Sequence, residues 1–175
     1  NGIDLSTKGG LVWTKARSSV SGAPTYYTHE LTDTVRGANN GLTTSTTAAQ
    51  SSSDVNGFTS TGFNLTYSTG RGNAYQINEA SWTFRKQPKF FDIVTYTGNG
   101  STQTINHNLG SAPGCIIVKS TSASGSNWFV YHRSLGVDNF VILNLTNAAL
   151  GYNGGFSNIT STSFGVADSN NGNGA

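Results

Sequence analysis

Two histidines, His29 and His132, stand beside aromatic residues and are suited by type to metal binding or proton transfer. A metal site needs about three or four converging ligands, and no HxH, HExxH or CxxC spacing occurs in the sequence. Cys115 is the only cysteine, so a zinc cluster lacks thiol ligands and no disulfide can form within the chain. We therefore expect no metal and no cofactor, and histidines at strand ends that form local hydrogen bonds. Cys115 itself, beside Gly114 and Ile116, is expected to be buried.

Paired carboxylates are the second group that could do chemistry. Hydrolysis of a glycosidic bond needs two of them held roughly 5 to 9.5 Å apart. Only Glu30 with Asp33, and Glu79 with Asp92, are close enough in sequence to consider. Nothing else marks either pair as a site, so the chain is not expected to be an enzyme. A glycan-cleaving enzyme stays open as an alternative, which loss of a measured activity on substitution of Glu30, Glu79 or Asp92 would support.

Two glycine-rich stretches resemble ligand loops only in part. Residues 168–174 lack the spaced carboxylates and the final glutamate of an EF-hand calcium loop. Residues 70–73 lack the helix and the Lys-Ser/Thr pair that follow a phosphate-binding loop. Both stretches are expected to be turns or linkers.

Aromatic side chains beside arginines are the best candidates for a binding surface, because aromatic rings stack on sugar rings and polar groups give direction. The candidate ligand-binding residues are Trp13, Tyr26, Tyr27, Arg36, Trp128, Tyr131 and Arg133. The alternative is that these aromatics form a core, as they usually do on alternating strand positions. Only one face of a strand can point inward, so about half of them should be exposed.

The segments that position these residues are short, β-branched or aromatic, and bounded by Gly, Pro, Asn or Ser, which is typical of antiparallel strands. Strands are expected at residues 11–15, 25–29, 42–47, 80–84, 90–97, 102–109, 115–119 and 127–133, with a bent strand pair over residues 57–67. The clearest predicted hairpin joins residues 90–97 to residues 102–109 through Gly98–Ser101. The sequence predicts an all-β fold, an antiparallel sandwich or jelly roll.

The composition limits the classes of partner that this chain is expected to bind. Only 10% of residues are charged, the net charge is +2, and the ten Lys and Arg are spread along the chain. Nucleic-acid binding is therefore not expected. No run approaches the ~18 apolar residues of a membrane span, and no signal peptide is recognisable. The absence of methionine indicates a mature, processed or excerpted chain.

The second half of the chain repeats the order of the first. Residues 11–15 match 115–119 at an offset of 104, residues 26–29 match 129–132 at 103, residues 46–49 match 146–149 at 100, and residues 58–65 match 159–166 at 101. Four matches in one order predict an internal duplication, with repeat units at residues 1–88 and 89–175. The first unit has no counterpart of the residue 90–109 hairpin, and the second has none of the residue 74–85 strand. Either the chain is part of a longer array, or the halves complete each other, or another subunit supplies a strand.

Several motifs are similar to a known family. They are Gly10–Arg17, Asp33–Gly37, Trp82–Pro88, Phe91–Gly100 and Leu109–Lys119. They resemble a domain of unknown function in structural and tail-appendage, or tail fibre-like, proteins of tailed phages, particularly those that infect marine bacteria. The resemblance covers nearly the whole chain. It implies a role in virion structure or host adhesion, and it supplies no catalytic residues.

The expected function is therefore a non-enzymatic structural module of a virion or extracellular appendage. Its expected partners are copies of itself, joined by strand complementation into a homo-oligomer, and other virion proteins. The alternative is a host-adhesion module that binds a surface glycan through its aromatic residues. The expected location is the virion or the outside of the cell.

Overall fold

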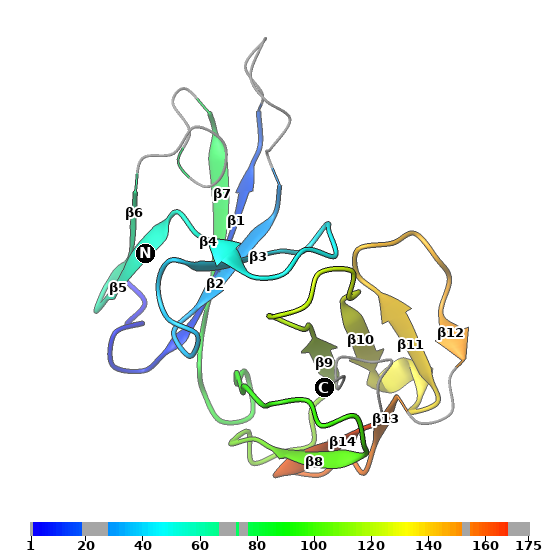
Figure 1. Ribbon diagram of the computed structural model, residues 1–175. Helices are drawn as coiled ribbons and strands as arrows, with labels where there is room; N and C mark the ends of the chain where they lie inside the picture. The colour runs from blue at the N-terminus through cyan, green and yellow to red at the C-terminus, as the bar shows by residue number, and fades with distance from the viewer. Residues whose placement is uncertain (1, 19–27, 67–72, 74–76, 152–154, 168–175) are drawn as a thin grey trace. The chain divides into compact units, whose positions relative to one another are not determined.

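The computed structural model describes residues 2–18, 28–66, 73, 77–151 and 155–167. These residues form antiparallel strands and one short 3-10 helix (Figure 1), which confirms the predicted all-β fold. The chain divides into two compact units. Unit 1 comprises Asn1–Ser45 and Gln50–Lys86, and unit 2 comprises Thr46–Ala49 and Gln87–Ala175. Within the described ranges, no helix has the length and apolar character that crossing a membrane requires.

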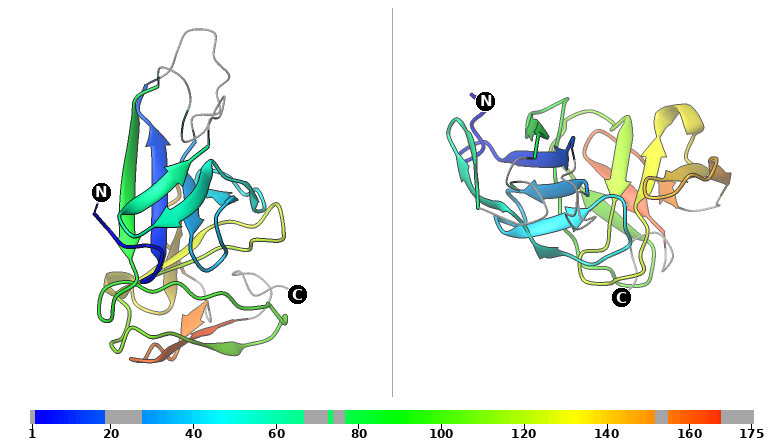
Figure 2. Two further views of the ribbon diagram at one scale, coloured as in Figure 1. Left: turned by 90° about the vertical axis from the view of Figure 1, so that its left-hand side faces the viewer. Right: turned by 90° about the horizontal axis from the view of Figure 1, so that it is seen from above.

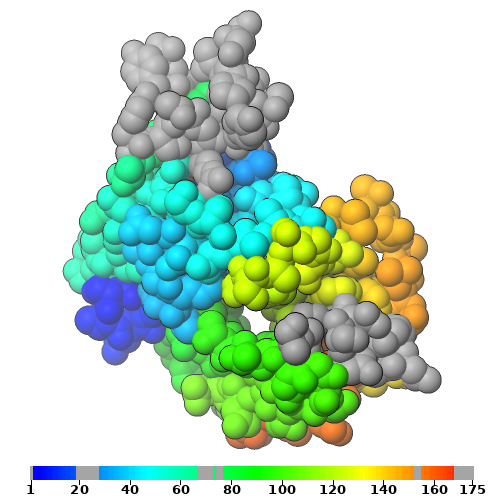
Figure 3. Space-filling model, in the orientation of Figure 1, coloured from blue at the N-terminus to red at the C-terminus, as the bar shows by residue number. Residues whose placement is uncertain are grey.

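Unit 1 contains a five-stranded antiparallel sheet and a separate β-hairpin. The strand order in the sheet is β4-β3-β2-β1-β7. Its members are β1 (Gly10–Ala16), β2 (Glu30–Asp33), β3 (Asn40–Thr43), β4 (Ser51–Ser52) and β7 (Glu79–Arg85). The hairpin pairs β5 (Val55–Thr59) with β6 (Gly62–Leu65). Figure 2 shows β1 and β7 running side by side along their length, and the blue and cyan segments of this unit form one continuous surface in Figure 3.

Alternation along β1 creates the core of unit 1. Val12, Thr14 and Ala16 are buried on one face, while the residues between them are half-buried on the other. Val12 packs with Leu5 and with Val55 of the hairpin. Burial of a side chain such as Val12 stabilises the fold by roughly 1.5 to 3 kcal/mol, so the hairpin is held to the sheet mainly by apolar contact.

Glycine at position 10 allows β1 and β7 to approach closely. Gly10 pairs with Arg85, and a Cβ atom at Gly10 would collide with the carbonyl oxygen of Phe84 and with the side chain of Leu5. Any larger residue there would force the strands apart. This pairing joins β7, the last strand in the order, to the rest of the sheet.

Unit 2 is a sandwich of two small antiparallel sheets. The first sheet has the order β12-β11-β10-β9 and the second the order β13-β14-β8. Their strands are β8 (Gln103–Asn106), β9 (Cys115–Val118), β10 (Phe129–His132), β11 (Asn139–Ile142), β12 (Leu150–Gly151), β13 (Phe156–Ser157) and β14 (Ser163–Val166), and the 3-10 helix η1 (Arg133–Leu135) follows β10. Inward-facing residues of both sheets share one core, which includes Ile116, Tyr131, Phe140, Phe156 and Phe164.

The predicted hairpin of residues 90–97 with residues 102–109 is wrong as a strand pair. β8 pairs instead with β14, with Ile105 opposite Phe164, and residues 92–99 form no strand. Residues 89–97 still run beside the second arm, since Asp92 Oδ2 accepts from Asn108 N at 2.8 Å and Thr97 O accepts from Gln103 Nε2 at 3.1 Å. The path was predicted correctly, but β8 forms its ladder with the strand that shares its core.

One further prediction is tested only in part, and another is wrong. The strand expected at residues 25–29 lies partly outside the described residues, and Thr28 and His29 precede β2, which begins at Glu30. Cys115 is exposed rather than buried, because β9 alternates and directs Ile116 and Val118 into the core. By contrast, the strands predicted at residues 11–15 and 80–84 and the bent strand pair within residues 57–67 are confirmed.

Candidate interaction surface

Aromatic residues gather on β1 and β7 in unit 1. Trp13 lies directly opposite Trp82 in the β1–β7 register, and their rings meet edge to face with centroids 6.2 Å apart. The indole Nε1 of Trp13 donates to His29 Nδ1 at 3.0 Å. Trp82 is 48% exposed. Trp13 is therefore held by a hydrogen bond to His29, whereas Trp82 is accessible to solvent.

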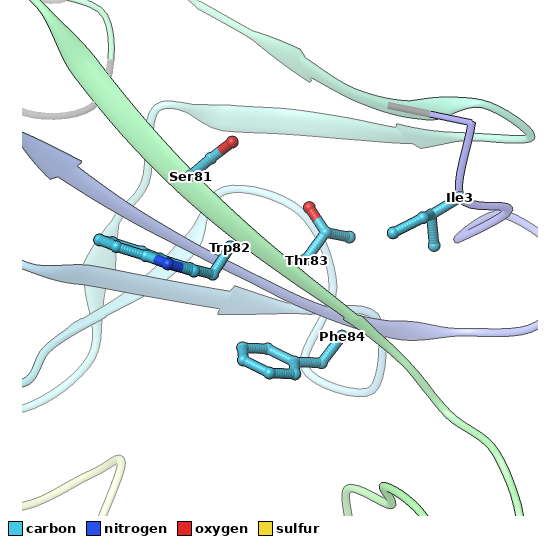
Figure 4. A pocket seen from close by; sticks show the side chains of 5 residues that line it. All are labelled: Ile3, Ser81, Trp82, Thr83 and Phe84. Atoms are coloured by element: carbon cyan, nitrogen blue, oxygen red, sulfur yellow. The ribbon is translucent and has the colours of Figure 1, made fainter.

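A shallow hollow of about 320 Å³ runs along β7. Its lining residues are Ile3, Ser81, Trp82, Thr83 and Phe84. Figure 4 shows Trp82 and Phe84 projecting to one side of the strand, and Ser81 and Thr83 projecting to the other with Ile3 beyond them. Aromatic rings and hydroxyl groups suit stacking and hydrogen bonding. These side chains give the hollow the groups for both kinds of contact.

Glu79, at the start of β7, has a carboxyl group that is buried in unit 1. Both of its carboxylate oxygens are buried, and no hydrogen-bond donor among the described residues reaches them. Burial raises the pKa of Glu79, an effect that nearby Lys15 opposes and Asp54 reinforces. A buried carboxylate that lacks a hydrogen-bond donor is costly, which is the physical reason why the neutral form of Glu79 is favoured.

The other carboxylates of the predicted pairs have partners within their own unit. Asp33 accepts from the Arg36 guanidinium at 2.6 Å and from the backbone N–H groups of Val35 and Arg36. Glu30 Oε1 accepts from Ser53 Oγ at 2.5 Å, which ties the segment after β4 to β2. Asp92, the predicted partner of Glu79, lies in unit 2 and accepts from Asn108 N.

The candidate ligand-binding residues in the described part of the chain are divided between the two units. Trp13 and Arg36 belong to unit 1, whereas Trp128, Tyr131 and Arg133 belong to unit 2. The remaining two candidates, Tyr26 and Tyr27, lie outside the described residues.

In unit 2 the candidate aromatic residues are buried. Trp128 is 4% exposed and donates its indole N–H to Thr46 O at 3.1 Å. Tyr131 lies in the core of unit 2. Because it is three positions after Trp128, the two side chains point to opposite sides of the extended chain. Arg133 is exposed and donates to Ala112 O. Sequence reasoning named these residues but omitted Trp82, whose exposure follows from its place on the last strand of the sheet.

Both histidines considered as ligands form local hydrogen bonds. His29 accepts from Trp13, and His132 Nδ1 accepts from Ser134 N at 3.3 Å. Across the described ranges, no group of three or more His, Cys, Asp or Glu side chains could hold a metal ion. The possible calcium loop at residues 168–174 lies outside those ranges, as does most of residues 70–73.

A family model described as a domain of unknown function (DUF7483) matches residues 2–175. The chain belongs to this family. Searches of curated proteins and of solved structures found no match to this DUF7483 domain.

The Trp13–His29 bond in the DUF7483 domain predicts a change with pH. Burial and the nearby Lys15 both lower the pKa of His29 below its ordinary value of 6.5. Neutral His29 accepts the hydrogen bond from the indole N–H of Trp13 at Nδ1. Protonation of Nδ1 removes this acceptor and breaks the hydrogen bond. The unfolded state takes up this proton at a higher pH, so stability is lost as the pH falls below 6.5 and through the lowered pKa of His29.

We expect the fluorescence of Trp13 to change with a midpoint below pH 6.5. A fluorescence titration of the wild type, minus that of Trp13→Phe, isolates this signal from the other tryptophans. A midpoint at or above 6.5 would contradict the prediction.

Proposed function

We propose that this chain is a non-enzymatic structural module of a virion or extracellular appendage, which assembles with copies of itself through the edges of its sheets. The observation that carries the proposal is the position of two strands at the ends of their sheets in the described part of the chain. β7 is the last strand of its sheet in unit 1, and β9 is the last strand of a sheet in unit 2, where Ile117 is 49% exposed. Edge strands are ready sites for the addition of another strand.

Two features support the virion part of this proposal. The motifs Trp82–Pro88 and Leu109–Lys119 resemble those of phage tail-appendage proteins. In addition, only 10% of the residues are charged. Many copies of such a chain could come together with little electrostatic repulsion.

The assembly state tests this function. Light scattering combined with electron microscopy on the full chain should show a discrete oligomer or a filament at micromolar concentrations. A monomer over the whole concentration range would overturn the proposal. That result would favour an independent binding module.

A second candidate is a host-adhesion module that binds a surface glycan. The specific observation in its favour is the exposed indole of Trp82 beside Trp13. Addition of a host polysaccharide should then shift the tryptophan fluorescence, and Trp82→Ala should abolish the shift. Phe90→Ala is the matched control, since Phe90 is 64% exposed but lies in unit 2. No shift across a broad polysaccharide panel would count against adhesion.

A further inference from the structure

The sequence of β7 is complementary to itself when one copy is reversed. The strand reads Glu79-Ala-Ser-Trp-Thr-Phe-Arg85, with opposite charges at its two ends and Trp82 at its centre. We propose that β7 pairs in antiparallel fashion with β7 of a second copy of this chain, about a two-fold axis at Trp82. This inference rests on the proposed function and specifies its first interface.

The two-fold register places complementary side chains opposite each other. Glu79 of each copy faces Arg85 of the other, Ser81 faces Thr83, and the small Ala80 faces the large Phe84. Opposite charges and paired hydroxyls on facing strand positions stabilise antiparallel sheets. Because the contact is isologous, each complementary pair occurs twice.

The backbone of β7 has the parity that this register needs. Lys86 N donates to Gly9 O at 2.9 Å and Asn78 O accepts from Arg17 N at 2.6 Å, so the even-numbered residues direct their backbone groups toward β1. Alternation then directs the backbone of the odd-numbered residues away from β1. The proposed register pairs odd-numbered residues with odd-numbered residues, as hydrogen bonding between the copies requires.

The unpaired carboxylate of Glu79 supplies a reason for the second copy. Its oxygens are buried without a partner among the described residues, and the Arg85 side chain at the other end of β7 is exposed. In the proposed dimer the Glu79 side chain turns toward the edge of β7, where the guanidinium of the second copy's Arg85 provides donors for its oxygens.

The centre of the interface is apolar. Trp82 is 48% exposed and lines the hollow along β7 (Figure 4). Directly facing positions that do not exchange hydrogen bonds bring their side chains closest together, and this is the relation of the two Trp82 residues. Stacked or edge-to-face indoles would remove much of their surface from water.

The edge strand of unit 2 lacks this pattern. β9 reads Cys-Ile-Ile-Val over Cys115–Val118 and carries no charge. It offers an open edge without charge complementarity between copies. It therefore serves as the matched control for β7.

Charge reversal tests the register. Light scattering over a concentration series gives the dimer dissociation constant of the full chain. Glu79→Arg alone or Arg85→Glu alone should raise this constant about tenfold, because each puts two like-charge pairs into the interface. The double variant should restore it to within about threefold of the wild type. Ile117→Lys on β9 should leave it unchanged.

A backbone variant adds an independent readout. Ser81→Pro removes an N–H that points away from β1, and an edge strand tolerates proline at such a position. It should abolish dimerisation while circular dichroism shows an unchanged fold.

The outcomes separate the two proposals. A wild-type chain that stays monomeric would overturn the self-associating function, and the β7 interface with it. An oligomer that persists in both single charge variants, or that only Ile117→Lys disrupts, would overturn the β7 interface alone. Weakening by each single reversal and recovery in the double variant supports both.

Discussion

Replacement of Asp33 by alanine is expected to lower the free energy of unfolding of unit 1 by about 3 to 5 kcal/mol, as breaking a buried ion pair does. Asp33 is 3% exposed, and its carboxylate accepts from Val35 N, Arg36 N and Arg36 Nε. Alanine would leave the guanidinium buried without its counter-ion. Urea denaturation followed by circular dichroism measures the loss.

Asp33→Asn is the control for this prediction. Asparagine keeps an oxygen acceptor for the two backbone N–H groups but removes the charge, so its loss should be smaller than that of alanine. A loss below about 0.5 kcal/mol for Asp33→Ala would contradict the argument, because surface substitutions have effects of that size.

Arg36 was predicted to bind a ligand. In the structure its guanidinium also donates to Gln50 Oε1 and Leu31 O, which fixes the turn after β2.

Phe164→Ala is expected to destabilise unit 2 by about 3 to 5 kcal/mol, through lost burial and the cavity left behind. Phe164 is 5% exposed, belongs to the core that joins the two sheets, and stacks on His107 with centroids 6.2 Å apart. Trp128, which is buried in the same unit, provides a fluorescence signal for urea unfolding. The matched control is Phe90→Ala at an exposed position, expected to change stability by less than about 0.5 kcal/mol. Equal effects of the two variants would contradict the assignment of the core.

Local patterns predicted the strands whose two faces differ. In β1 buried and half-buried positions alternate, and in the β5–β6 hairpin Gly62 directly follows the turn, and both residue patterns are visible in the sequence. Residues 90–97 alternate equally well, yet β8 pairs with β14. That choice depends on a core formed by residues about 60 positions apart, which a local pattern does not record.

Strand register shows the same limit. Sequence similarity aligned Tyr26–His29 with Phe129–His132, at an offset of 103. The structure pairs Glu30 with Thr43 and Phe129 with Ile142, so β2–β3 and β10–β11 correspond at an offset of 99 at both ends. A short motif rich in Tyr, Thr and His aligns in several ways, whereas a ladder has one register. The duplication itself stays a prediction.

The candidate surface was predictable only in part. Residue type alone identified Trp13 but could not separate it from Trp128, since both are tryptophans on strands and only contacts decide which is covered. The strand containing Trp82 was predicted, and the opposite charges of Glu79 and Arg85 are visible in the sequence. What the sequence lacks is the strand order that puts β7 at an edge.

The assignment of Thr46–Ala49 to unit 2 means that no single cut separates the units. Gly125 N donates to Thr47 O at 2.9 Å, and the Trp128 indole donates to Thr46 O. A fragment beginning at Gln87 would omit both acceptors, and one ending at Lys86 would retain a segment whose partners are gone. The two units are therefore not independent segments of sequence. Transfer of unit 2 to another protein would require Thr46–Ala49 to be transferred together with residues 87–175.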